Sequence, residues 1–119
     1  MKLTIKRDQA DMKGVFGGHK GVRFKLYAKV DINEEERALI ERYRVRDHIL
    51  ASYERPIKRS SEKLEFHLSV NDIINGRTTE MESISTLLDL EDAIKDGCQN
   101  LKILLEVMNT FGGEQIIEI

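Results

Sequence analysis

The sequence predicts a single α+β domain over residues 1–119. Two stretches alternate apolar and polar residues, which is the periodicity of strands that are buried on one face. A long third stretch repeats apolar residues at steps of three and four, as an amphipathic helix does. The 119 residues are 40% hydrophobic, which is enough to build a core without a metal ion or a disulfide.

The first half of the chain contains the clearest strand signal. Residues 2–7 place Leu3 and Ile5 on one side of a short predicted strand, and a glycine-rich loop follows over residues 8–21. The next strand, residues 22–30, alternates inward apolar residues with outward polar ones. The apolar set is Val22, Phe24, Leu26, Ala28 and Val30, and the outward set is Arg23, Lys25, Tyr27 and Lys29.

Asn33 predicts the start of a helix. Its side chain can accept a hydrogen bond from the backbone of Glu36 while the Glu36 side chain reaches back, which forms a capping box. Residues 34–36 are all glutamate, and negative charge is favourable at this end of a helix. We expect the helix to end near residues 43–45. A short strand over residues 49–53 follows, and it ends before Pro56.

The second half begins with a polar loop over residues 57–63 and a strand over residues 64–70. Residues 71–76 predict a one-turn helix that starts at Asn71 and is closed by Gly76; the alternative is a type I′ turn at Asn75 and Gly76. A helix over residues 86–109 follows. Its apolar stripe consists of Leu87, Leu90, Ile94, Gly97, Leu101, Leu104, Met108 and Phe111. Gly112 and Gly113 end this helix, and residues 114–119 predict a last strand.

From residue 22 onward the order of elements is β-α-β-β-α-β. This order predicts a ferredoxin-like sheet with both helices on one face, and the strand over residues 2–7 adds an edge. The alternative fold is an N-terminal β-meander followed by a separate helical half.

The net charge of −2 hides an uneven distribution. Residues 1–60 hold 15 Lys and Arg against 9 Asp and Glu, a net charge of +6, whereas residues 61–119 hold 4 against 12, a net charge of −8. The net charge of −2 excludes a uniformly basic nucleic-acid binder. The asymmetry indicates either a local basic face or two halves that attract each other, within one chain or between chains.

The sequence favours a cytoplasmic location. The N-terminal residues lack the apolar segment of a signal peptide, and no window approaches the roughly 18 consecutive apolar residues of a membrane-spanning helix. Cys98 is the only cysteine, so it cannot form an internal disulfide. We therefore expect no membrane partner.

The loop over residues 14–21 resembles a phosphate-binding loop but departs from that motif. His19 stands where the second glycine belongs, Gly21 follows Lys20 where a Ser or Thr should hold magnesium, and the loop leads into a strand instead of a helix. A nucleotide-hydrolysing loop is thus excluded. The candidate binding face, which we call the basic strand surface, consists of Lys13, His19, Lys20, Arg23, Lys25, Tyr27 and Lys29.

No catalytic, metal or cofactor site is predicted. The three histidines (His19, His48 and His67) and Cys98 lack metal-ligand spacing, and Cys98 lies beside the apolar stripe, where we expect it to be buried and inert. Acidic residues of the long helix are expected on its exposed side; they are Asp89, Glu91, Asp92 and Asp96.

Gly97 lies on the apolar stripe in the middle of the long helix. A glycine there costs about 1 kcal/mol relative to alanine, so it indicates close packing against the sheet or against a symmetry-related copy. The helix also carries more apolar positions than one sheet face covers, and the last strand offers an open edge. Both features favour a homodimer.

Three segments together resemble a group of small uncharacterised bacterial proteins: residues 70–78, the long helix, and residues 111–116. The resemblance covers the C-terminal half and implies a bacterial cytosolic protein with no assigned activity. We therefore expect a non-enzymatic, self-associating module that binds a protein partner. The less favoured alternative is a nucleic-acid or anion binder that uses residues 13–29.

Overall fold

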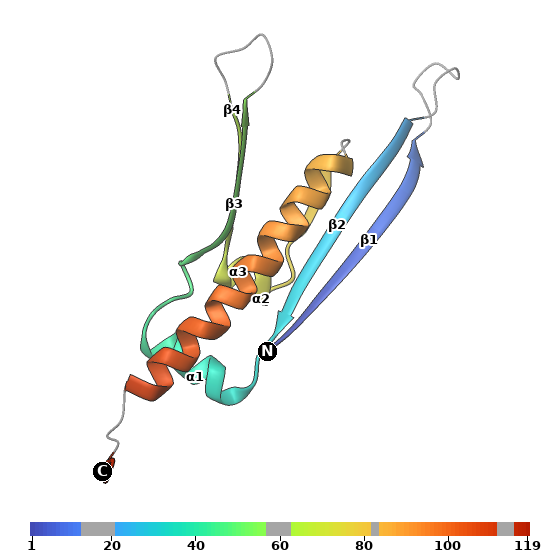
Figure 1. The fold of residues 1–119 in the computed structure, drawn as a ribbon. Helices are drawn as coiled ribbons and strands as arrows, with labels where there is room; N and C mark the ends of the chain where they lie inside the picture. Colours follow the sequence, from blue (N-terminus) through green and yellow to red (C-terminus); the bar gives the residue numbers. More distant parts are fainter. Residues whose placement is uncertain (13–20, 57–62, 82–83, 112–115) are drawn as a thin grey trace.

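The computed structural model describes residues 1–12, 21–56, 63–81, 84–111 and 116–119, and it confirms a mixed α+β fold (Figure 1). A three-stranded antiparallel sheet contains β1 (Lys2–Met12), β2 (Gly21–Asp31) and β5 (Thr78–Met81) in the order β1-β2-β5. A second, two-stranded sheet pairs β3 (Ile49–Pro56) with β4 (Lys63–Ser69). The long helix α3 (Ile84–Phe111) runs between the two sheets.

The predicted strand over residues 22–30 is confirmed as β2, and its inward residues Leu26, Ala28 and Val30 are buried. β1 pairs with it from Lys2 opposite Asp31 to Met12 opposite Gly21. β1 is therefore longer than the predicted strand over residues 2–7. Residues 8–12 do not alternate in polarity, so only their pairing with β2 reveals them as strand. The rest of the predicted loop, residues 13–20, lies outside the described residues, as do residues 57–62.

The sheet order differs from the predicted ferredoxin-like arrangement. In the structure β1 pairs along one edge of β2, β5 pairs with the other edge over Phe24–Tyr27, and β3 and β4 form a sheet of their own. The helices do not share one face of a single sheet, because α3 contacts both sheets. Residues 116–119 are not in a strand, so the predicted last strand is wrong for them. The meander alternative also differs, because β5 of the second half pairs with β2 of the first.

The capping box at Asn33 is confirmed. The backbone N–H of Glu36 donates to Asn33 Oδ1 at 2.7 Å, and the backbone N–H of Asn33 donates to Glu36 Oε1 at 3.1 Å. The helix, α1 (Glu34–Arg42), is anchored by the buried side chain of Ile40 and ends where Arg44 adopts a positive φ of 55°. The sequence thus predicted both the start and the approximate length of α1.

The predicted one-turn helix is present as α2 (Val70–Ile74), but its N-cap is Ser69 instead of Asn71. The side chain of Ser69 accepts from the backbone of Asp72, so the capping box begins two residues earlier than expected. Gly76 follows with a φ of 75°, a conformation that glycine adopts without strain. A Cβ atom on Gly76 would lie 2.7 Å from Tyr27 Oη, which packs the turn against β2.

The apolar stripe of α3 forms the centre of the core. Its buried members are Leu87, Leu90, Ile94, Gly97, Cys98, Leu101 and Leu105, and they pack with residues of both sheets. Gly97 lies against β3: a Cβ atom there would be 2.1 Å from the carbonyl oxygen of Leu50. Phe111, in contrast to its predicted place on the stripe, is exposed.

We expect Gly97→Ala to destabilise the protein although alanine favours helix. The new methyl group overlaps the Leu50 carbonyl, and moving α3 away from β3 should cost about 1–3 kcal/mol, more than the roughly 1 kcal/mol gained in helix propensity. Urea denaturation would measure the change, with Gln99→Ala at an exposed position of α3 as the matched control. An equal or higher stability of Gly97→Ala would contradict the close approach.

Candidate interaction surfaces

Part of the basic strand surface is neutralised within the fold. Lys25 Nζ lies 3.0 Å from Glu80 Oε1, and Arg23 Nη1 lies 3.6 Å from Glu80 Oε2. The hydrogen bond and the charge of Lys25 lower the pKa of the Glu80 carboxyl group, and Arg23 adds to this effect. Two of the cations predicted to meet a ligand therefore already meet an acid on β5. Three other predicted members lie outside the described residues: Lys13, His19 and Lys20.

The remaining members of this surface, Tyr27 and Lys29, alternate with the buried Leu26, Ala28 and Val30 along β2, so they lie on the other face of the same sheet. The Tyr27 ring is half-buried because its hydroxyl packs against Gly76. The strand register places Lys6 of β1 opposite Tyr27 and Thr4 opposite the exposed Lys29. Lys6 was missed in the sequence because its place beside Tyr27 depends on the pairing of β1 with β2.

The buried carboxylate of Glu91 joins α3 to β1. Arg7 Nε donates to Glu91 Oε2 at 3.0 Å, the Arg7 Nη2 group donates to Glu91 Oε1, and Lys95 Nζ lies 3.6 Å from Glu91 Oε1. Glu91 is only 3% exposed, so its predicted place on the exposed side of α3 is wrong. The burial of Glu91 could have been predicted from its spacing. It lies four residues after Leu87 and seven before Cys98, which places it on the buried side of the helix.

We expect Arg7→Ala to lower the free energy of unfolding by about 1–2 kcal/mol, because it removes two hydrogen bonds from a buried charge. Lys6→Ala is the matched control, since the Lys6–Asp8 pair is exposed and 3.9 Å long and should contribute less than about 0.5 kcal/mol. Thermal and urea denaturation would compare the two variants. Equal effects would contradict the role of the Arg7–Glu91 pair.

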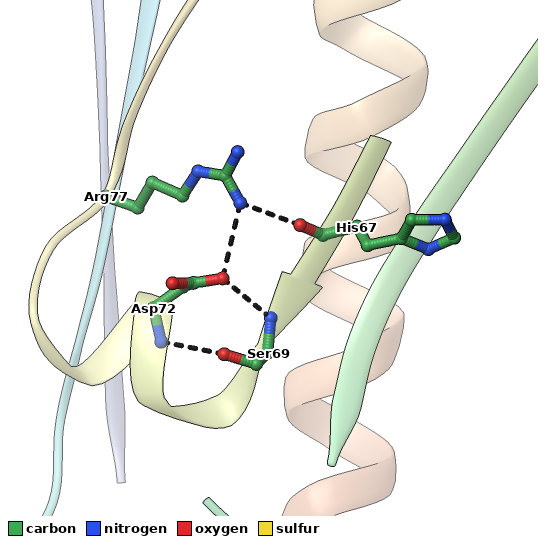
Figure 2. A network of polar contacts seen from close by, with 4 residues as sticks. All are labelled: His67, Ser69, Asp72 and Arg77. Atoms are coloured by element: carbon green, nitrogen blue, oxygen red, sulfur yellow. Dashed lines mark hydrogen bonds and ion pairs between the residues drawn. The ribbon is translucent and has the colours of Figure 1, made fainter. Parts of the chain in front are cut away.

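A polar network fixes the chain where it passes from β4 through α2 to β5 (Figure 2). The Ser69 backbone N–H donates to Asp72 Oδ2 at 3.1 Å, and Arg77 Nη1 donates to the same oxygen at 3.2 Å and to the His67 carbonyl at 2.7 Å. The guanidinium of Arg77 also lies 4.6 Å from the centre of the Phe66 ring. The hydrogen bond from the Ser69 backbone is the main reason that the pKa of Asp72 is lowered, and Arg77 contributes.

The lowered pKa of Asp72 predicts a pH dependence of stability. The stabilisation by the ionised carboxylate is complete above the unfolded-state pKa of about 3.9 and is lost as the pH falls through the lower folded-state pKa. We expect Asp72→Asn to reduce stability at neutral pH and to flatten its decline below about pH 4. Urea denaturation across this range would test this, with Asp89→Asn as the control; an unchanged slope for Asp72→Asn would refute it.

The described residues contain no group of three or more His, Cys, Asp and Glu that could hold a metal ion. Cys98 is buried, and burial raises the pKa of its thiol to about 11, so it is not a thiolate nucleophile at neutral pH. His48 and His67 are both exposed; His48 immediately precedes β3, and His67 lies on β4. A cavity of about 250 Å³ between α1 and α3 is lined by Glu35, Glu36 and Glu106 among others, without a nucleophile beside a base.

An uncovered apolar surface lies on the C-terminal half of α3. We define the α3 apolar surface as Ile103, Val107 and Phe111, which are 53%, 46% and 83% exposed. Their spacing of four residues places them on one side of the helix. Ile49 of β3 is also half exposed, and it lines a cavity of about 100 Å³ with Leu104 of α3.

The same exposed side of α3 is acidic in its N-terminal half. Asp89, Asp92 and Asp96 are all exposed, and they precede Ile103 at helical spacing. Beyond the helix, Ile116, Ile117 and Ile119 are exposed. The three aspartates therefore precede the α3 apolar surface along the exposed side of the helix.

Comparison of the chain with family models, with curated proteins and with solved structures finds no match. Among the helices of the described residues, none is long and apolar enough to cross a membrane.

Proposed function

We propose that this protein is a non-enzymatic interaction module that associates with a second copy through the α3 apolar surface. The observation that carries the proposal is the exposure of Ile103, Val107 and Phe111 on one side of a helix whose opposite side forms the core. Single exposed apolar residues are common on protein surfaces. Three on successive turns form a contiguous patch of the kind found at interfaces.

The composition of this surface supports a protein partner. Interface centres are poor in charged residues and rich in aromatic and aliphatic ones, and the α3 apolar surface has an aromatic residue and two aliphatic ones. A cytoplasmic location belongs to the same proposal, because a lone, buried cysteine suits a reducing compartment.

The anion-binding alternative has weaker support. Glu80 contacts both Arg23 and Lys25, so an anion would have to compete with an acid that is already in place. The Tyr27 ring, which would have to stack on a base, is half-buried against Gly76. What favours the alternative is the exposed Lys29, which lies on the same face of β2 as Tyr27.

We expect the wild-type protein to form a dimer and Val107→Glu to be mostly monomeric, with a dissociation constant at least tenfold higher. The reason is that the substitution buries a charge in the centre of the contact. A tenfold increase in the dissociation constant corresponds to a loss of only about 1.4 kcal/mol of binding free energy. Size-exclusion chromatography with light scattering would measure both. Gln99→Glu adds the same charge two turns earlier on the exposed side of α3 and should remain dimeric. A wild-type protein that is monomeric at high concentration would overturn the proposal.

A further inference from the structure

We infer that β1 binds an extended acidic segment of a partner protein, which adds a strand to the three-stranded sheet. The surface involved is separate from the α3 apolar surface, so this binding does not require the proposed self-association. Three observations lead to it: the unpaired edge of β1, the features that protect the other strand edges, and the charges that flank β1.

β1 is an edge strand along its full length. It pairs with β2 through 11 consecutive residues, from Lys2 to Met12, without a shift in register. Among the described residues, no strand pairs with its other side. The backbone N–H and C=O groups of an edge strand that face away from its neighbour are unpaired, so this edge offers a row of hydrogen-bonding groups to an incoming strand.

The other strands carry features that hinder the addition of a strand. β5 has only four residues. The register of β3 with β4 shifts between Ile49 and Ala51, and β3 ends at Pro56, which has no N–H to donate. On β4 the carbonyl of His67 already accepts a hydrogen bond from Arg77. Of the described strands, β1 therefore offers the longest regular edge.

The side chains of β1 determine which strand fits beside it. On the outer face of the sheet, Lys2 and Lys6 are exposed, and the contact of Lys6 with Asp8 is an exposed pair 3.9 Å long. An acidic residue opposite either lysine would be stabilised, since opposite charges on neighbouring strands attract. On the inner face, Leu3 and Ile5 are half-buried and pack against the core. Apolar residues of an added strand would cover them, so the strand that fits alternates acidic and apolar residues.

A second copy of β1 fits this edge less well than an acidic segment does. Alternation places one acidic residue, Asp8, on the outer face of β1, so a second copy compensates only one of the two lysines. The antiparallel register that sets Lys6 opposite Asp8 also sets the two Arg7 residues opposite each other, and like charges at opposite positions are destabilising. An acidic segment can compensate both lysines at once.

Peptide binding tests the inference. The probe is a fluorescently labelled synthetic peptide with the 11-residue length of β1 that alternates Glu and Val, and the matched control alternates Lys and Val. Fluorescence anisotropy should give the Glu–Val peptide a dissociation constant about tenfold lower than that of the Lys–Val peptide, because two attractive cross-strand pairs replace two repulsive ones. Equal affinities, or no binding of the Glu–Val peptide at millimolar protein concentration, would overturn the inference.

Charge reversal at Lys6 separates strand addition from general attraction to a basic face. Lys6→Glu should weaken binding of the Glu–Val peptide about fivefold and strengthen binding of the Lys–Val peptide. Lys29→Glu makes the same change on β2, one strand further from the edge, and should have a smaller effect on both peptides. Equal effects of the two variants would contradict strand addition.

Hydrogen exchange measured by NMR gives a readout that needs no variant. The bound Glu–Val peptide should slow amide exchange at every second residue of β1, because only the N–H groups that face away from β2 gain a partner. Slower exchange in α3 alone would place the peptide on the α3 apolar surface and refute the inference.

The two proposed surfaces can fail separately. Val107→Glu should lose the dimer and still bind the Glu–Val peptide. A wild-type dimer that Lys6→Glu dissociates would assign the edge of β1 to a second copy and would overturn the inference.

Discussion

α3 has to cover two sheets at once, and the rest of the structure depends on this. Within the described residues the two sheets share no strand pair, so α3, together with the short helix α2, joins them in one core. On one side Gly97 lets the α3 backbone approach the Leu50 carbonyl of β3. On another side Arg7 reaches from β1 to the buried carboxylate of Glu91. A helix packed on two layers needs a wide buried face, which explains why residues flanking the predicted stripe, Cys98 and Leu105, are buried too.

The same arrangement brings some of the unevenly distributed charges together. Arg7 and Glu91 belong to the positive and negative halves of the sequence, and so do Lys25 and Glu80. Each pair joins an element of the first half to one of the second. The halves therefore attract each other within one chain, at the positions where β1 meets α3 and where β2 meets β5. The pairing of the first half with the second is thus electrostatic as well as apolar, and less of the positive charge on β2 is left for a ligand.

Elements whose signals lie within a few neighbouring residues could be predicted from the sequence. Elements that form only by pairing with a distant strand could not. Alternation revealed β2, and the spacing of Asn33 and Glu36 revealed the start of α1, because these signals lie within a few residues of each other. β5 has only four residues, and three of them are Thr78, Thr79 and Glu80, so its sequence lacks an apolar alternation. Its strand character comes from its register with β2. β5 takes the place beside β2 that the predicted topology gave to another strand, and β3 and β4 pair only with each other, so the predicted topology differs from the structure.

The C-terminal turns of α3 give an independent reason for a partner. The buried residues of the helix end at Leu105, and after it only Met108 is even half-buried. Helices in proteins are stabilised mainly by the packing of one face. The segment beyond Leu105 contains Val107, Asn109 and Thr110, which have low helix propensity, and its last turn has no basic residue to favour the end of the helix. In the single chain, Met108 supplies most of the core packing of this segment, whereas the proposed contact with a second copy would add packing at Val107 and Phe111.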